Sequence, residues 1–276
     1  MRYLAAQWAD DVERAVEYSG GSVVRVRSGE SVHGWSQTSR RAVRTWLYED
    51  VHLRGATGVA ALGVTPPELP AHLRQDVMSP GWAEGGVVGG QRVIRNAAGL
   101  ELIVEERRIQ RSGAGQVDVL LPRFRANVLP GWHSVTSLRG APDGRLLRLY
   151  LSAWPLSQIF ALIEALDQKP ESWAVKWSTD DAQVRPDSAV LYLTRPSAPE
   201  LLVLADRFDG GAEREVPGFS CRRGPTIALG GSVAHPRSGS FGSLVADNAA
   251  RAVLVGHDLR GELGVLTDEL VEQWRA

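Results

Sequence analysis

The chain is poor in cysteine and has no long apolar run, and each shortage excludes a class of protein. Its single cysteine, Cys221, excludes an internal disulfide and a zinc site built from cysteines. No apolar run approaches the roughly 18 residues that a membrane span requires. The first residues, Met1 to Leu4 and then a run of acids, lack the cationic end and apolar core of a signal peptide. We therefore expect a cytoplasmic protein with no membrane partner.

The charge balance and the histidine spacing exclude further classes. A net charge of −1 argues against nucleic-acid binding, and 43% apolar with 23% charged residues is ordinary for a globular protein. None of the 6 histidines has the HxxxH or HxH spacing of a metal site, so we predict neither a metal nor an organic cofactor.

Lysine is the scarcest charged residue. Of 31 basic residues all but Lys169 and Lys176 are arginine. Arginine keeps its proton at any working pH, whereas a desolvated lysine can lose one and act as a base. Lys169 follows Asp167 and Gln168 in a polar turn, but Lys176 stands within an apolar strand pattern. Lys176 is therefore the candidate base.

Hydrophobic periodicity predicts helices at both ends of the chain and strands between them. We expect an α+β fold with a central mixed, largely antiparallel β-sheet that contains a β-α-β unit. We expect a mostly helical N-terminal subdomain, 1–80, followed by an α+β domain, 81–276. The alternative is that the two form one continuous unit. The expected helices span 4–18, 37–49, 155–168 and 197–208, with a long C-terminal pair near 241–273, and the expected strands span 87–95, 99–106, 116–121 and 145–153.

Residues 145–178 carry the most informative pattern. Side chains alternate along a strand, so Arg148 and Tyr150 share one face of the first strand, and Lys176 has the polar face of the second. Helix 155–168 lies between the two strands and must cover their apolar faces. By elimination, Arg148, Tyr150 and Lys176 project together from the opposite face.

A third strand, 190–194, follows Arg185-Pro186-Asp187 and adds Tyr192 to this region. A lysine, two tyrosines and one or two arginines on one sheet face suit an anionic ligand, because arginine forks grip phosphate oxygens. The alternative is a solvated strand face with no function, which is the more common role of such residues.

Other residues are weaker candidates. Arg125, in Arg123-Phe124-Arg125, places a cation where a phosphorylated peptide could bind, although a solvated strand edge is the favoured alternative. His133, in a turn that adjoins the sheet, is a candidate general acid or else a surface histidine. Cys221 lacks a placed base and is a poor candidate nucleophile.

Short motifs spread from about residue 40 to residue 255 recur together in one known family. They are Trp46-Leu47-Tyr48-Glu49 with His52, Pro80-Gly81-Trp82, Leu129-Pro130-Gly131-Trp132-His133, Arg148-Leu149-Tyr150, Val175-Lys176-Trp177, Arg185-Pro186-Asp187-Ser188-Ala189-Val190-Leu191-Tyr192, Val216-Pro217-Gly218-Phe219-Ser220 and Ser240-Phe241-Gly242. In their order and spacing, the chain resembles the HopA-type effector-like proteins, which take their name from a plant-pathogen type III effector.

The resemblance implies an eliminating lyase. In class V lanthipeptide and thioamitide pathways, a kinase-like partner phosphorylates Ser or Thr of a precursor peptide, and the HopA-type protein then expels phosphate to leave dehydroalanine or dehydrobutyrine. Residues 148–178 are also similar to the phosphothreonine lyases, in which an acid histidine and a base lysine lie on two such strands. Lys176 falls at the base, but Tyr150 stands where that histidine would be. The acid therefore stays open between Tyr150 and His133.

The resemblance also implies the partners and the remaining site residues. We expect Arg148, Arg185 and Arg125 to bind phosphate and Asp187, Tyr192 and Ser240 to support the site. The expected partners are a phosphorylated precursor peptide, with its leader and core, a kinase-like phosphotransferase, and a cysteine decarboxylase or cyclase component. The chain departs from the family after Ser240-Phe241-Gly242, where an arginine is common. A non-catalytic subunit that binds the peptide or the kinase is the second hypothesis.

Overall fold

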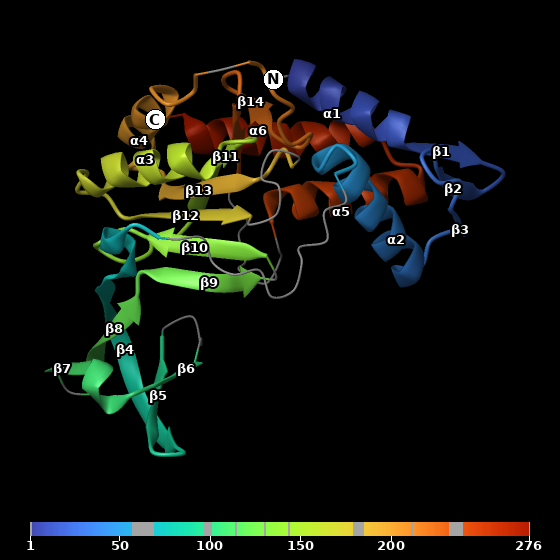
Figure 1. The fold of residues 1–276 in the computed structure, drawn as a ribbon. Helices are drawn as coiled ribbons and strands as arrows, with labels where there is room; N and C mark the ends of the chain where they lie inside the picture. Colours follow the sequence, from blue (N-terminus) through green and yellow to red (C-terminus); the bar gives the residue numbers. More distant parts are fainter. Residues whose placement is uncertain are drawn as a thin grey trace.

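A computed structural model of the chain describes residues 2–56, 69–96, 101–113, 115–129, 131–142, 144–178, 185–210, 212–231 and 240–275. The fold is α+β, with helices near both ends (Figure 1). The α-helices are α1 (Arg2–Ala15), α2 (Gln37–Leu47), α3 (Leu156–Asp167), α4 (Ala198–Asp206), α5 (Phe241–Val255) and α6 (Leu259–Trp274). A π-helical turn, Tyr48–His52, extends α2, and short 3₁₀ turns span Ala71–Arg74 and Glu106–Arg108. None of these helices is both long enough and apolar enough to span a membrane, within the residues described.

The strands form three sheets. They are β1 (Val16–Ser19), β2 (Ser22–Arg25), β3 (Ser31–His33), β4 (Asp76–Val88), β5 (Gln91–Arg95), β6 (Glu101–Val104), β7 (Ile109–Gly113), β8 (Gln116–Pro122), β9 (Phe124–Leu129), β10 (Trp132–Thr136), β11 (Leu146–Leu151), β12 (Trp173–Ser178), β13 (Ala189–Thr194), β14 (Cys221–Arg222) and β15 (Ile227–Gly230).

A seven-stranded sheet with the order β14-β15-β11-β13-β12-β10-β9 forms the centre. Every neighbouring pair is antiparallel. Because β11 and β12 both run antiparallel to β13, they run parallel to each other, and α3 connects them. The structure thus confirms the predicted largely antiparallel sheet and its β-α-β unit. It also places β13 between the two strands, which the sequence pattern did not predict.

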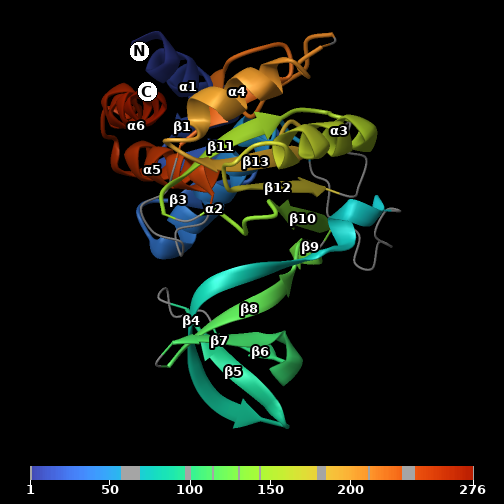
Figure 2. The ribbon, with the colours of Figure 1, turned by 90° about the vertical axis from the view of Figure 1, so that its left-hand side faces the viewer.

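Helices cover both faces of this sheet (Figure 2). On one face, α3 and α4 pack on the apolar side chains of the strands, among them Leu149, Val175 and Leu191, all fully buried. On the other side, α1 and α2 pack with α5 and α6 in a second core around Trp8 and Ala246. The N-terminal and C-terminal helices therefore share one core.

Residues 16–33 form a small three-stranded sheet, β1-β2-β3, in addition to the expected helices. The helix predicted over 4–18 ends at Ala15, and Gly20 and Gly21 turn the chain into a hairpin with φ of 56° and 81°. Positive φ is accessible to glycine at little cost, and consecutive positive φ values suit a tight hairpin.

A five-stranded sheet, order β6-β5-β4-β8-β7, projects from the main body and is called the β-lobe here (residues 76–122; Figures 1 and 2). The single strand predicted over 87–95 is wrong: Gly89 and Gly90 form a hairpin turn between β4 and β5. Strands β5 and β6 pair as an antiparallel hairpin, and residues 97–100 between them lie outside the described residues. The proposed boundary at residue 80 falls inside β4.

Arg123 joins the β-lobe to the main body. It stands between β8 and β9 with no exposed surface. Its Nε donates a 2.6 Å hydrogen bond to the Thr136 carbonyl, and its guanidinium ion-pairs with Asp167 and lies 5.5 Å from the Trp173 ring centroid. A solvated edge is therefore the wrong interpretation for Arg123, which is a buried structural cation with its charge and donors satisfied.

Candidate functional site

The polar face of the seven-stranded sheet brings Arg148, Tyr150 and Lys176 together through the strand register. Tyr150 of β11 and Lys176 of β12 both pair with Val190 of β13, so the three lie in one row. Arg148 pairs with Tyr192 in the next row on the same face. Strands lie about 4.8 Å apart, which separates the Cα atoms of Tyr150 and Lys176 by about 10 Å.

Lys176 is a partly buried amine against an aromatic ring. Its Nζ lies 4.2 Å from the ring centroid of Trp132, which neighbours it from β10. The pKa of Lys176 falls from its ordinary 10.5 to about 8, chiefly because of burial; the Asp187 charge raises it, and the Arg185 and Arg148 charges lower it. At pH 7 about a tenth of this amine is neutral, far more than for a solvated lysine.

Two arginines flank the lysine. Arg148 donates a 2.6 Å hydrogen bond to the Gly231 carbonyl, and its guanidinium lies 5.7 Å from the Tyr192 ring centroid. Arg185 ion-pairs with Asp187 at 2.9 Å and lies 5.4 Å from the ring centroid of Trp132. The guanidinium groups thus have a fixed orientation.

The cluster formed by Arg148, Lys176, Arg185 and Asp187 contains one carboxylate for its three cationic side chains. An excess of positive charge in a partly desolvated place favours an anion with several oxygen atoms, because guanidinium groups donate paired hydrogen bonds to it.

Tyr150 is buried, and its hydroxyl has no hydrogen-bond partner among the described residues. Burial strongly raises its pKa, with the opposing effect of the Arg148 charge second, so the hydroxyl keeps its proton over the working pH range. A buried hydroxyl without an acceptor is costly, which suits a donor that meets its acceptor only when a ligand binds.

His52 orients Tyr150 from the π-helical turn. Its ring meets the Tyr150 ring edge-on, with centroids 5.6 Å apart, and stacks on Phe219. Burial lowers the pKa of His52 to about 4, so the imidazole is neutral at pH 7. A neutral, fully packed ring positions its neighbour and does not supply a cationic acid.

The Ser240-Phe241-Gly242 triplet has a clear role in the fold. Ser240 caps α5, accepting a hydrogen bond from the Ser243 backbone at 3.1 Å, and its side chain also hydrogen-bonds to Tyr48. Phe241 packs on Trp8 with ring centroids 6.2 Å apart. Gly242 contacts His52 so closely that a side chain at this position would overlap the imidazole.

The structure separates His133 from the other candidates. His133 pairs with Trp177, whereas Ser134 pairs with Lys176, so the His133 side chain projects from the opposite face of the sheet. It is fully buried there, with its ring centroid 5.5 Å from that of Phe124, and burial lowers its pKa. The hypothesis that His133 reaches the Lys176 face is therefore wrong, because one position along a strand reverses the face.

Arg125 lies on the Lys176 face at its far side. Ser134 pairs with both Lys176 and Arg125, which completes the row across β12, β10 and β9. Arg125 is exposed, and within the part of the chain that the structure describes no carboxylate pairs with it.

Cys221 is not an activated thiol. Burial raises the pKa of the Cys221 thiol. Arg222 and Arg223 instead pair with Glu213 and Asp206. The thiol therefore has a smaller anionic fraction than an ordinary cysteine, which disfavours nucleophilic catalysis.

Three site residues were missed at the level of sequence: Trp132, Tyr48 and His52. All three fall in the motifs that carry the family resemblance, which was the available signal. Strand alternation alone also places Trp132 on the Lys176 face once β10 is known to pair with β12. The contacts of Tyr48 and His52 depend on how the helices pack, which periodicity does not encode.

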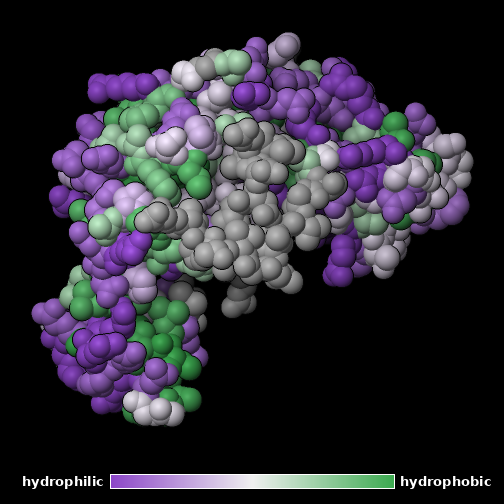
Figure 3. Space-filling model, viewed as in Figure 1, coloured by the Kyte–Doolittle hydropathy of each residue, from purple (hydrophilic) through white to green (hydrophobic). Residues whose placement is uncertain are grey.

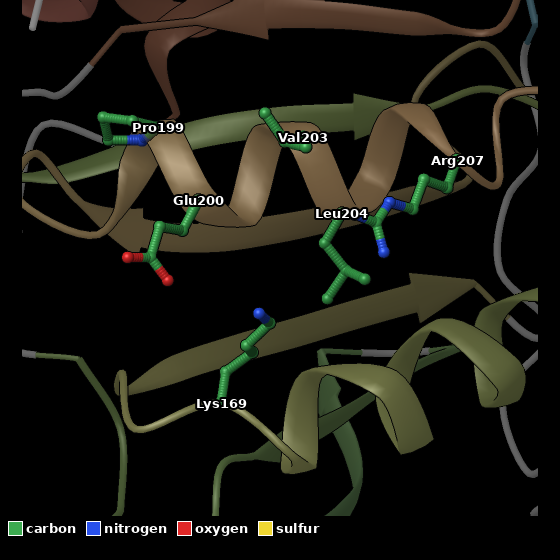
Figure 4. Close-up of a pocket in the computed structure, with 6 residues that line it drawn as sticks. All are labelled: Lys169, Pro199, Glu200, Val203, Leu204 and Arg207. Carbon is green, nitrogen blue, oxygen red and sulfur yellow. The ribbon is translucent and has the colours of Figure 1, made fainter.

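Lys169 lies away from the candidate site. It lies beside α4 in a shallow hollow of about 400 Å³ with Glu200 and Arg207, on the side of the sheet that α3 and α4 cover (Figure 4). The sheet separates it from Lys176. In the described residues, no three His, Cys, Asp or Glu side chains lie close enough together to hold a metal ion.

Comparisons with known proteins give weak matches. No family model matches the chain, and no curated protein matches it. An effector protein from Pseudomonas syringae pv. syringae strain 61 is similar in structure, with 17% identity and a TM-score of 0.40. Another, from Pseudomonas syringae pv. tomato strain DC3000, has 16% identity and a TM-score of 0.38. Each alignment covers 50% of this chain and 58% of the effector, so the chain spans less than two thirds of either.

Proposed function

We propose that this protein is a lyase that eliminates phosphate from phosphoserine or phosphothreonine residues of a ribosomal precursor peptide. In this proposal it works after a separate kinase-like phosphotransferase, in lanthipeptide or thioamitide biosynthesis. The observation that supports it is the amine of Lys176, whose pKa burial lowers to about 8, between Arg148 and Arg185 on one sheet face. That combination provides a base and an anion site in one place.

The reaction would proceed as a β-elimination. Neutral Lys176 removes the Cα proton, and the electron pair forms the Cα–Cβ double bond as the Cβ–O bond breaks. Phosphate leaves with the electrons of that bond and remains paired with Arg148 and Arg185, which offset its charge. Tyr150 gives a proton to the leaving oxygen, or donates a hydrogen bond to the enolate-like carbonyl. The products are dehydroalanine or dehydrobutyrine and inorganic phosphate, and solvent restores the protons.

The remaining cluster residues would act by positioning. Asp187 fixes Arg185 through their ion pair, and Trp132 holds Lys176 and Arg185 over its ring. Tyr192 fixes Arg148, and Ser240 fixes Tyr48. This arrangement keeps the cations in place before a phosphorylated residue arrives, which reduces the reorganisation needed on binding.

The test is phosphate release coupled to thiol trapping. A phosphoserine peptide incubated with the protein should release inorganic phosphate and yield a product that forms an adduct with an added thiol. Lys176→Arg should lose both signals, because arginine keeps the charge but cannot accept a proton. Phosphate release without a thiol-reactive product would indicate a phosphatase. An intact phosphopeptide that nevertheless binds would favour the non-catalytic subunit.

A further inference from the structure

A groove lies between the β-lobe and the main body, and it is lined by Arg125, which shares a strand row with Lys176. Its volume is about 940 Å³. The β-lobe lines it with Ser79–Trp82, Leu102–Glu105 and Leu120–Pro122, and the body lines it with Arg125 and Arg139–Pro142. We call this space the lobe groove.

The walls of the lobe groove are held in a fixed relation to each other. Strand β8 of the β-lobe continues through Arg123 into β9 of the central sheet, and the buried contacts of Arg123 tie that junction to the main body. On the other wall, Ser137 Oγ donates a 2.8 Å hydrogen bond to the Gly140 carbonyl, which shapes the turn that carries Arg139. A preformed groove costs little ordering when a ligand binds.

The β-lobe wall combines an apolar surface with an unpaired strand edge. Ile103 exposes 56% of its surface on β6, and Figure 3 shows hydrophobic residues gathered along one side of the lobe. In the sheet order, β6 is an edge strand, so within the described residues its outer backbone groups face no other strand. Extended peptides bind such edges through main-chain hydrogen bonds and place alternate side chains in pockets.

The body wall is cationic and continuous with the candidate site. Arg125 and Arg139 make no ion pair within the residues that the structure describes, whereas Arg108 on the lobe side pairs with Asp76 at 2.9 Å. Arg125 also belongs to the strand row that contains Lys176. Two strand spacings separate the Cα atoms of the two residues, which is a distance of about 10 Å. An extended chain covers that distance in about three residues.

From this continuity, we infer that the lobe groove binds an extended, acidic and apolar segment of the same polypeptide whose phosphorylated residue lies at Lys176. The apolar side chains of the segment would pack on the β-lobe near Ile103, and its carboxylates would pair with Arg125 and Arg139. The segment would begin about three to four residues from the phosphorylated residue. This inference rests on the proposed function for the identity of the polypeptide, but its binding step can be measured separately.

The experiment compares a short synthetic phosphoserine peptide with two versions of a longer one. The short probe has about three residues on each side of the phosphoserine, and the long probe adds an alternating Leu/Glu segment of about eight residues. The segment is placed on the N-terminal side in one version and on the C-terminal side in another. The measured quantity is the ratio of kcat/KM for the long probe to that for the short probe.

The intact protein should prefer one version of the long probe by about tenfold or more. Ile103→Asp and Arg139→Glu should each reduce that preference towards one, because an aspartate opposes the apolar contact and a glutamate repels the segment. Val87→Asp and Arg41→Glu are matched controls, since Val87 is 57% exposed on the β-lobe outside the groove and Arg41 is exposed on α2. Both controls should keep the preference.

Binding of the unphosphorylated long peptide, followed by fluorescence anisotropy, separates this inference from the proposed function. If neither probe is eliminated but the long peptide binds in a manner that depends on Ile103 and Arg139, the groove assignment stands and the lyase proposal fails. Equal kcat/KM for the short probe and both long versions would overturn the groove assignment. The groove assignment would also be overturned if the native chain self-associates and Ile103→Asp does not. That result would assign the groove to a second copy of the chain.

Discussion

Replacing Lys176 with methionine should stabilise the fold while it removes the proposed base. Burial lowers the pKa of this amine from 10.5 to about 8, which corresponds to a cost of about 3 kcal/mol for the protonated form in the folded state. Methionine fills a similar volume beside Trp132 and has no charge to desolvate. We expect the free energy of unfolding at pH 7 to rise by up to about 3 kcal/mol, and Tm by at most about 6 °C.

The stability gained by Lys176→Met should depend on pH, because the charge that it removes titrates differently in the folded and unfolded states. The unfolded state binds more protons than the folded state between about pH 8 and the ordinary lysine pKa, so the native protein gains stability as pH rises through that window. The difference between Lys176→Met and the native chain should therefore be largest below pH 8 and vanish above about pH 10.5.

Urea unfolding at several pH values measures both quantities. Lys169→Met is the matched control, because Lys169 is the other lysine of the chain and lies in a shallow surface hollow. It should change stability by less than about 0.5 kcal/mol. A destabilised Lys176→Met protein, or a gain that does not depend on pH, would refute the desolvated state of Lys176.

The remaining predictions concern rate and recognition. The kcat/KM for a phosphopeptide should rise tenfold per pH unit up to about pH 8 and then level off, and a midpoint near 10 would remove the lowered pKa of Lys176 from the mechanism. Arg185→Lys should weaken phosphopeptide binding about tenfold without affecting the unphosphorylated peptide, and equal weakening would contradict phosphate recognition. Tyr150→Phe should lower the rate by about 10²–10⁴-fold, whereas His133→Asn, which changes the opposite face, should not impair chemistry in protein that remains folded. Gly242→Ala should cost about 1–3 kcal/mol of stability and lower the rate by displacing His52, and a neutral result in both assays would show that His52 does not position Tyr150.

The pattern of the sequence predicts the faces of the central strands better than their neighbours. Alternation places Tyr150 and Lys176 on one face, because the period of two is a local property of an extended chain. The position of β13 between the two strands follows from long-range pairing, which leaves no local mark. His133 was predicted to lie in a turn, because a proline and a glycine precede it by a few residues. It lies instead in β10, with its side chain on the buried face of the sheet.

The sequence pattern also does not predict how the terminal helices pack on the rest of the fold. The periodicity of 37–49 predicts α2, but not that the chain continues in a π-helical turn whose His52 meets Tyr150. Such contacts depend on which helix lies over which face, and several arrangements bury the same apolar stripe. The family resemblance included Tyr48 and His52 among its recurring motifs. It did not reveal that His52 contacts Tyr150.

The mass of the peptide product tests the central claim most directly. A defined phosphoserine peptide is incubated with the full chain alone, and its mass is compared with that of the same peptide lacking phosphate. We expect a product one water lighter than the unphosphorylated peptide, formed by the native chain and not by Lys176→Arg protein that retains its fold. A product equal in mass to the unphosphorylated peptide, or elimination that persists in Lys176→Arg, would contradict it.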